Sequence, residues 1–92
     1  MEKIELFPSL SHCIETIARE EFWNSVNQYL EGGCQDRQLE DKINLLRAFL
    51  ESADFKKLRS QSEQHLVQGQ RIKFVISRQA DEVTCEMVVS KG

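Results

Sequence analysis

Long apolar runs, paired cysteines and glycine-rich loops are all missing from the sequence. No stretch of about 18 or more apolar residues occurs, and no charged start leads into an apolar segment, so neither a membrane helix nor a secretory signal is predicted. Proline occurs once and glycine four times in 92 residues, so no flexible linker is expected to divide the chain. We expect a single small globular domain over residues 1–92, located in the cytoplasm and without a membrane partner.

Cysteine is too sparse for a disulfide framework or a zinc site. The three cysteines, Cys13, Cys34 and Cys85, are odd in number, and no two of them lie closer than twenty-one residues apart. Structural zinc sites usually draw their ligands from tight cysteine pairs. The sequence therefore favours a reducing compartment and predicts no metal and no cofactor.

The neighbours His12 and Cys13 are the first candidates for catalytic chemistry, because a histidine can activate a thiol. Neighbouring residues of a helix point about 100° apart, however, which is poor geometry for a hydrogen-bonded pair. Cys13 also falls on an apolar stripe, so we expect its thiol to be buried and inert. Cys34 follows a glycine in a loop and is expected to be the most exposed of the three thiols.

Adjacent carboxylates and adjacent glycines are the remaining candidates for a catalytic or phosphate-binding site. They are Glu20 with Glu21, Glu40 with Asp41, and Gly32 with Gly33. Adjacent carboxylates on a helix splay apart and are typical of a solvated face, and the glycine pair neither follows a strand nor precedes a lysine. The sequence predicts no catalytic residue, and a small thiol-dependent enzyme using Cys13 or Cys34 is the weakest of three functional hypotheses.

Apolar side chains between residues 36 and 67 follow the clearest helical period in the chain. Spacings of four, three, four and three residues place five of them on one stripe of a helix, which Leu45 and Phe49 widen. The five stripe residues are Leu39, Ile43, Leu46, Leu50 and Ala53. With Asp36 as the N-cap, this helix is predicted to run from Arg37 to about Glu51.

Residues 52–54 are predicted to break this helix, because serine and aspartate compete for backbone hydrogen bonds and favour caps. The alternative is one continuous helix from 36 to 67. After the break, a third helix is expected to run from residue 55 to a stop at Gly69. Its apolar content is low, so it should be the most exposed of the helices.

An earlier helix is predicted to start from a cap on Ser9 or Ser11 and to end at Gly32 and Gly33. Its apolar stripe is Leu10, Cys13, Ile14, Ile17, Phe22, Val26, Tyr29 and Leu30. Trp23 broadens this stripe. We expect its aromatic residues to be buried or half-buried in packing and not to be the centre of an interface.

Beyond Gly69 the period changes to two, as in a strand with one buried face. Two alternating runs, at residues 72–76 and 83–89, flank a turn at residues 79–82. If paired residue numbers sum to 161, all apolar partners fall on one face of a hairpin. These partners are Ile76 with Cys85, Phe74 with Met87, and Ile72 with Val89.

These elements predict an α+β fold. Two or three antiparallel helices pack on a small antiparallel sheet built from the C-terminal β-hairpin, to which residues 4–7 can add a third strand. The order of elements is then (β)αααββ. A single helical pair is too short for a solenoid of helical repeats.

Charge is unevenly distributed along the chain. Residues 1–51 carry ten acidic and five basic side chains, whereas residues 52–92 carry five acidic and seven basic ones, for a net charge of -3. The candidate partner-binding residues are all basic: Lys56, Lys57, Arg59, Arg71 and Lys73. On a helix Lys56 and Arg59 share a face, and Lys73 projects from the face of the hairpin away from the core.

We therefore expect a non-enzymatic protein–protein interaction or regulatory module whose basic C-terminal surface binds an acidic protein. Nucleic acid is the alternative ligand, although a pI of about 5.4 and the lack of aromatic residues among the bases are unfavourable for it. The chain is expected to be a monomer or a homodimer. Val75 and Val88 on the second face of the sheet are candidates for a dimer contact if no helix covers them.

Overall fold

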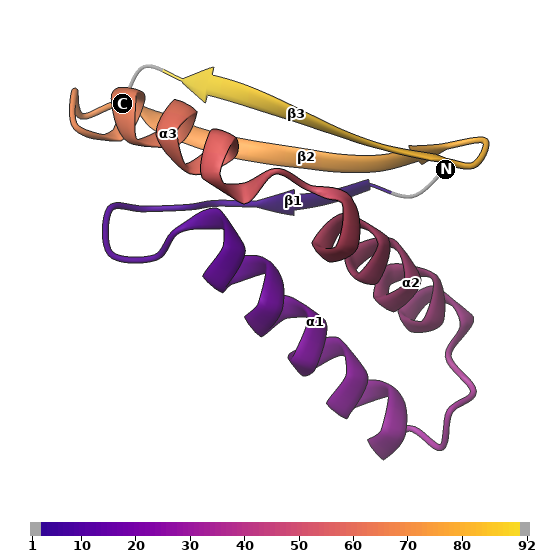
Figure 1. Ribbon diagram of the computed structural model, residues 1–92. Coiled ribbons are helices and arrows are strands. Elements are labelled where there is room, and N and C mark those ends of the chain that lie inside the picture. The colour runs from indigo at the N-terminus through magenta and orange to yellow at the C-terminus, as the bar shows by residue number, and fades with distance from the viewer. Residues whose placement is uncertain (1–2, 91–92) are drawn as a thin grey trace.

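The computed structural model describes residues 3–90, which form three helices and one three-stranded antiparallel sheet (Figure 1). The elements are, in order, β1 (Lys3–Leu6), α1 (Ile14–Glu31), α2 (Arg37–Ser52), α3 (Phe55–Leu66), β2 (Arg71–Gln79) and β3 (Glu82–Ser90). The predicted α+β fold and its C-terminal hairpin are confirmed. The N-terminal strand is present, so the order is βαααββ.

β2 is the central strand, and β1 and β3 form the two edges of the sheet. The hairpin has the register predicted from the alternating residues. The pairs on its inner face are Ile76 with Cys85, Phe74 with Met87, and Ile72 with Val89. A slip of one residue would turn these side chains away from the helices, so burial of the inner face maintains the register.

The turn of the hairpin is shorter than predicted. Gln79 pairs with Glu82, which leaves Ala80 and Asp81 as the two turn residues. Ala80 has a φ of 54°, in the left-handed region that favours glycine. The turn therefore carries some backbone strain at Ala80.

Aspartate side chains start both later helices, as the sequence predicts. Oδ1 of Asp36 accepts hydrogen bonds from the backbone N–H groups of Gln38 and Leu39, at 3.0 and 3.2 Å. Oδ1 of Asp54 accepts from the N–H of Lys57 at 3.2 Å. The predicted break between residues 52 and 54 is confirmed, so the segment contains two helices.

α1 begins later than predicted, at Ile14, and its N-cap is Cys13. The prediction that Ser9 or Ser11 caps this helix is wrong. Ser9 instead closes a tight turn before the helix, where its Oγ accepts from the backbone N–H of His12 at 3.1 Å. A serine engaged in this turn cannot also cap a helix that starts five residues later.

The apolar core lies between the helices and the inner face of the sheet. Within residues 3–90 its buried members are Ile4, Leu6, Ile14, Ala18, Leu45, Leu46, Phe49, Ile72, Phe74 and Ile76. The buried face of α2 is centred on Leu45, Leu46 and Phe49, whereas Leu39 and Ile43 are only half-buried. The predicted stripe is thus rotated, because the residues expected only to widen it point most directly at the sheet.

The C-terminal half of α1 extends away from the sheet (Figure 1). Trp23 and Leu30 are each 61% exposed. Because they are seven residues apart, or about two helical turns, they lie on the same side of α1. The prediction that they belong to the buried stripe is wrong, because the sheet ends before this part of α1. Gly32 follows the last residue of the helix as its C-cap, as predicted.

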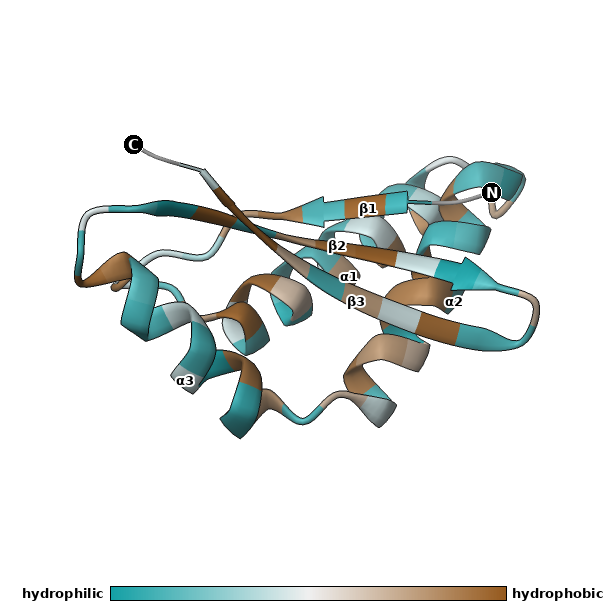
Figure 2. Ribbon diagram, turned by 90° about the horizontal axis from the view of Figure 1, so that it is seen from above, coloured by the Kyte–Doolittle hydropathy of each residue, from teal (hydrophilic) through white to brown (hydrophobic). Residues whose placement is uncertain are grey.

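The helices cover the three strands unequally. The inward side chains of β1 and β2 are buried, whereas those of β3 are half-buried or exposed: Val83, Cys85, Met87 and Val89. In the view from above, α3 lies to one side of β3, outside the area that the strands cover (Figure 2). The prediction of one buried face therefore holds for β2 and fails for β3.

Candidate functional site

The five predicted partner-binding residues occupy different parts of the molecule. Lys56 and Arg59 line an open hollow between α1 and α3, and Lys57 lines a second hollow between α3 and β3. Arg71 is exposed at the start of β2, and Lys73 lies on the face of the sheet away from the core. The structure thus brings Lys56 and Arg59 together and separates them from Lys73.

Lys73 already has a partner within the chain. Its Nζ donates to Oε2 of Glu5 at 2.9 Å. Since β1 and β2 bury alternate residues, both side chains lie on the open face of the sheet, opposite the helices. A ligand of Lys73 would have to displace Glu5, so the better candidate site is the one between α1 and α3.

The N-terminal ends of two helices meet at this site, which we call the α1–α3 junction. α1 starts after Cys13 and α3 starts after Asp54, with a hollow of about 440 Å³ between them. Its walls are formed mainly by Cys13, Glu15, Phe55, Lys56, Arg59 and Glu63. The positive end of a helix dipole lies at each helix start, so the junction attracts negative charge.

The first turn of α3 adds further positive charge to this end of the helix. It contains Lys56 and Lys57 and no acidic residue. Within residues 3–90 neither lysine makes an ion pair. Bases in the first turn of a helix are unfavourable by about 0.3 to 1 kcal/mol each, so the stability of α3 does not explain their presence.

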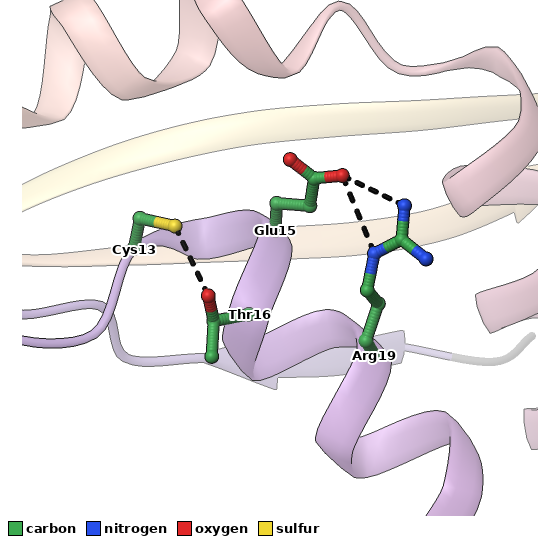
Figure 3. Close-up of polar contacts among 4 residues, drawn as sticks. All are labelled: Cys13, Glu15, Thr16 and Arg19. Carbon is green, nitrogen blue, oxygen red and sulfur yellow. Dashed lines mark hydrogen bonds and ion pairs between the residues drawn. The ribbon is translucent and has the colours of Figure 1, made fainter.

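The acidic residues at the junction are paired with arginines. Oε2 of Glu15 accepts from Nη2 of Arg19 at 2.8 Å (Figure 3), and Oε1 of Glu63 accepts from Nε of Arg59 at 3.1 Å. Both pairs join exposed side chains one helical turn apart, where such pairs contribute about 0.3 to 0.5 kcal/mol. Arg59 can therefore exchange Glu63 for an external carboxylate at little cost.

Cys13 is half-buried at the N-cap of α1 and is not the buried core thiol that the sequence predicts. Its Sγ lies 3.3 Å from Oγ1 of Thr16 (Figure 3). The hydrogen bond with the Thr16 side chain, followed by those with backbone N–H groups of the first turn and the charge of Arg59, lowers the pKa of the Cys13 thiol. Thr16 does not stand out by residue type, but its spacing from Cys13 is that of an N-cap and the third helical residue.

The other two thiols lie away from the junction. Cys34 is exposed in the loop after α1, as expected. Cys85 lies on β3 beside the hollow between α3 and β3, where desolvation raises the pKa of its thiol to about 11. Of these environments, the one around Cys13 favours the thiolate and the one around Cys85 opposes it.

The junction is suited to binding an anion more than to acid–base chemistry. Within residues 3–90, no histidine lines its hollow, and Nδ1 of His12 lies 3.3 Å from Oγ of Ser11. In the same part of the chain, no three histidine, cysteine or acidic side chains are grouped so that they could hold a metal ion. Also among these residues, no helix is both long enough and apolar enough to cross a bilayer.

Comparisons with other proteins identify a family for the chain. A family model matches residues 2–90, so the chain belongs to that family, whose function is unknown. No curated protein and no solved structure matches the chain. Functional inference therefore depends on the geometry and charge of the described residues.

Proposed function

We propose that this family member is a non-enzymatic protein–protein interaction module that binds an acidic segment of a partner protein at the α1–α3 junction. Its binding residues are Lys56 and Arg59, which line the junction, and Lys57, which lies next to them in the first turn of α3 and lines the neighbouring hollow; we call these three residues the basic α3 surface. The observation that supports this most strongly is the pair of lysines in the first turn of α3, which is unfavourable for the helix and makes no ion pair among the described residues.

Arg59 supplies the directional part of carboxylate recognition. A guanidinium can bind a carboxylate through two parallel hydrogen bonds, whereas the contact of Arg59 with Glu63 uses Nε alone. Phe55 gives the hollow a firm wall, because its ring packs edge-on against Phe49 with 5.4 Å between ring centroids. A carboxylate entering the hollow would meet Arg59 and Lys56 from α3 and the N-terminal end of α1.

An acidic protein suits this surface better than nucleic acid. The chain has a net charge of -3, so the rest of its surface repels a long phosphate backbone. The structure also separates Lys73 from the basic α3 surface, which leaves few bases to follow such a backbone. Trp23, an exposed aromatic side chain that could stack on a base, lies on α1 and not among the bases of α3.

The proposal can be tested by titrating isotope-labelled protein with a short capped peptide rich in aspartate and glutamate. We expect NMR shifts at residues 13–16 and 55–60, and binding that weakens as salt is added. The double substitution Lys56→Glu and Lys57→Glu should abolish these shifts. The same two proteins can serve as baits in a pull-down, in which the partner should be retained by the parent and lost from the variant.

Arg37→Glu is the control for charge reversal outside the junction, because Arg37 is an exposed base in the first turn of α2; it changes the net charge by half as much as the double substitution. This substitution should leave peptide binding unchanged. Equal loss of binding in the control would show that only net charge matters, and no shifts at the junction would refute the proposal. Stronger binding of single- or double-stranded oligonucleotides at the same residues would favour the nucleic-acid alternative.

A thiol-dependent activity is the second candidate, and the lowered pKa of Cys13 supports it. In a variant with Cys34→Ser and Cys85→Ser, the alkylation rate of Cys13 can be measured against pH. We expect its midpoint to lie below about 8.5, the ordinary value for cysteine. The further substitution Thr16→Val should raise this midpoint, and an ordinary midpoint with Thr16 in place would remove the support for this candidate.

A further inference from the structure

We propose that the free edge of β3 binds an extended segment of a partner protein as a fourth strand of the sheet. The segment would have apolar side chains facing α3 and basic side chains on the open face of the sheet. This proposal does not depend on the function proposed at the α1–α3 junction, although Lys57 of the basic α3 surface also lines the hollow beside β3.

The two edges of the sheet differ in how they are protected. β1 has four residues, includes Lys3 and Glu5, and is followed closely by Pro8. β3 has nine residues with no proline, glycine or lysine, and its pairing with β2 is continuous from Glu82 to Ser90. Natural proteins usually shorten, charge or bulge an exposed edge to prevent pairing. β3 is neither short nor bulged, and its only charged residues are Glu82 and Glu86.

The backbone of β3 offers a regular set of hydrogen-bonding groups at this edge. In a hairpin with a two-residue turn, the two residues that close the turn form a hydrogen-bonded pair. Along the two strands, hydrogen-bonded pairs of residues then alternate with pairs that are not hydrogen-bonded. Because Gln79 and Glu82 close the turn, the N–H and C=O groups of alternate residues point away from β2. These residues are Val83, Cys85, Met87 and Val89.

The side chains of the same four residues lie on the inner face of β3, and two of them, Val83 and Cys85, line a hollow between β3 and the helices α2 and α3. This hollow has a volume of about 360 Å³. Its apolar side is formed by Phe49, Ala53, Leu58 and Val83 with Cys85, and its polar side by Ser52, Asp54, Lys57 and Gln61. α3 lies to the side of β3 in Figure 2, and its residue Leu58 lines the hollow together with Val83 and Cys85 of β3. An added strand would place alternate apolar side chains next to this hollow.

Charge on the opposite face indicates which segment fits. Glu82 and Glu86 are the charged residues of β3, and both alternate with the inward side chains. Directly opposed cross-strand residues of opposite charge stabilise a strand pair, and like charges destabilise it. A basic residue opposite Glu86 is therefore favourable, whereas a second copy of β3 paired along its full length would place Glu86 opposite itself.

The experiment uses two short capped peptides as probes, one alternating valine with lysine and the other alternating valine with glutamate. Hydrogen exchange and NMR shifts of the full chain are followed as each peptide is added. We expect the lysine peptide to bind and to slow amide exchange at Val83, Cys85, Met87 and Val89. Replacing the central residue of this peptide by proline should abolish the effect, because proline cannot donate to a strand ladder.

Glu86→Lys reverses the charge of the edge at an exposed side chain and should leave the fold intact. We expect this variant to bind the glutamate peptide more tightly than the lysine peptide. One cross-strand charge pair should change the affinity of a peptide by up to roughly fivefold. Glu51→Lys is the matched control, since Glu51 is an exposed acidic residue on α2, and it should not change the preference.

Three results would overturn this proposal. The lysine peptide could fail to protect the four amides, or the preference could be the same in the parent and in the Glu86→Lys variant. Finally, the four amides could become protected when the protein alone is concentrated, which would identify a second copy as the occupant of the edge.

Discussion

β2 and β3 share an alternating pattern of residues and differ in what lies beneath them. Ile72, Phe74 and Ile76 of β2 are at most 4% exposed, whereas Val89, the partner of Ile72, is 38% exposed. An alternating pattern thus specifies which side of a strand faces inward, but the extent of the helical layer decides whether that side is covered. β3 extends past this layer, and stability and binding are therefore expected to reside in different strands.

The largest expected effect is the difference between two separate truncations, one at each member of a single cross-strand pair. Phe74→Ala should destabilise the protein by about 3 to 5 kcal/mol, because it leaves a cavity in a fully buried position. Met87→Ala, opposite it on β3, should cost about 1 kcal/mol or less, since Met87 is only half-buried. Urea unfolding of both variants measures the difference, and equal losses would show that β3 is covered as well as β2.

Leu46→Ala tests the helical side of the same core. Leu46 is fully buried on α2, so its truncation should cost about 2 to 5 kcal/mol and lower the thermal midpoint by many degrees. Leu30→Ala removes the same atoms from an exposed position on α1 and should stay within about 0.5 kcal/mol of the parent. A midpoint for Leu46→Ala within a degree or two of the parent would refute the assignment of the core.

Ala80→Gly should stabilise the turn that joins the covered strand to the uncovered one. Ala80 has a positive φ, which costs an alanine about 1 to 2 kcal/mol and costs glycine little. Glycine is more flexible in the unfolded chain, so the net gain should be about 1 kcal/mol or less. Chemical denaturation should show a higher midpoint with an unchanged slope; a lower midpoint would show that the turn is not strained.

The smallest effect concerns the pH dependence of Cys85. Its pKa is raised to about 11 in the folded protein, so folding favours the protonated thiol. This contribution to stability is complete below the ordinary pKa of about 8.5 and is lost as the pH rises towards 11. Stability measured between pH 8 and 11 should therefore fall less steeply in Cys85→Ser than in the parent, and identical slopes would contradict the raised pKa.

The parts of the fold that follow from local signals could be predicted from the sequence. Asp36 and Asp54 are strong capping residues at the starts of their helices, and the two-residue period of the hairpin permits one register that keeps its apolar side chains together. The start of α1 could not be predicted in this way. Ser9 is a good capping residue, but its turn with His12 competes for the same side-chain oxygen.

Burial and the candidate site depend on how the elements pack, which the sequence pattern does not reveal. The rotation of α2 and the exposure of Trp23 follow from the position and length of the sheet. Helical spacing placed Lys56 and Arg59 on one face, as the structure also does. The hollow that they line together with Cys13 joins segments far apart in the chain, so no local pattern indicates it.

Residue-resolved amide hydrogen exchange of the dilute protein tests most directly whether the outer edge of β3 is open. An open edge predicts alternating behaviour along the strand, with slow exchange at Thr84, Glu86 and Val88, whose N–H groups point towards β2. Exchange should be fast at the intervening residues Val83, Cys85, Met87 and Val89. Uniform slow exchange along β3 would show that its outer edge is already covered and would contradict the account.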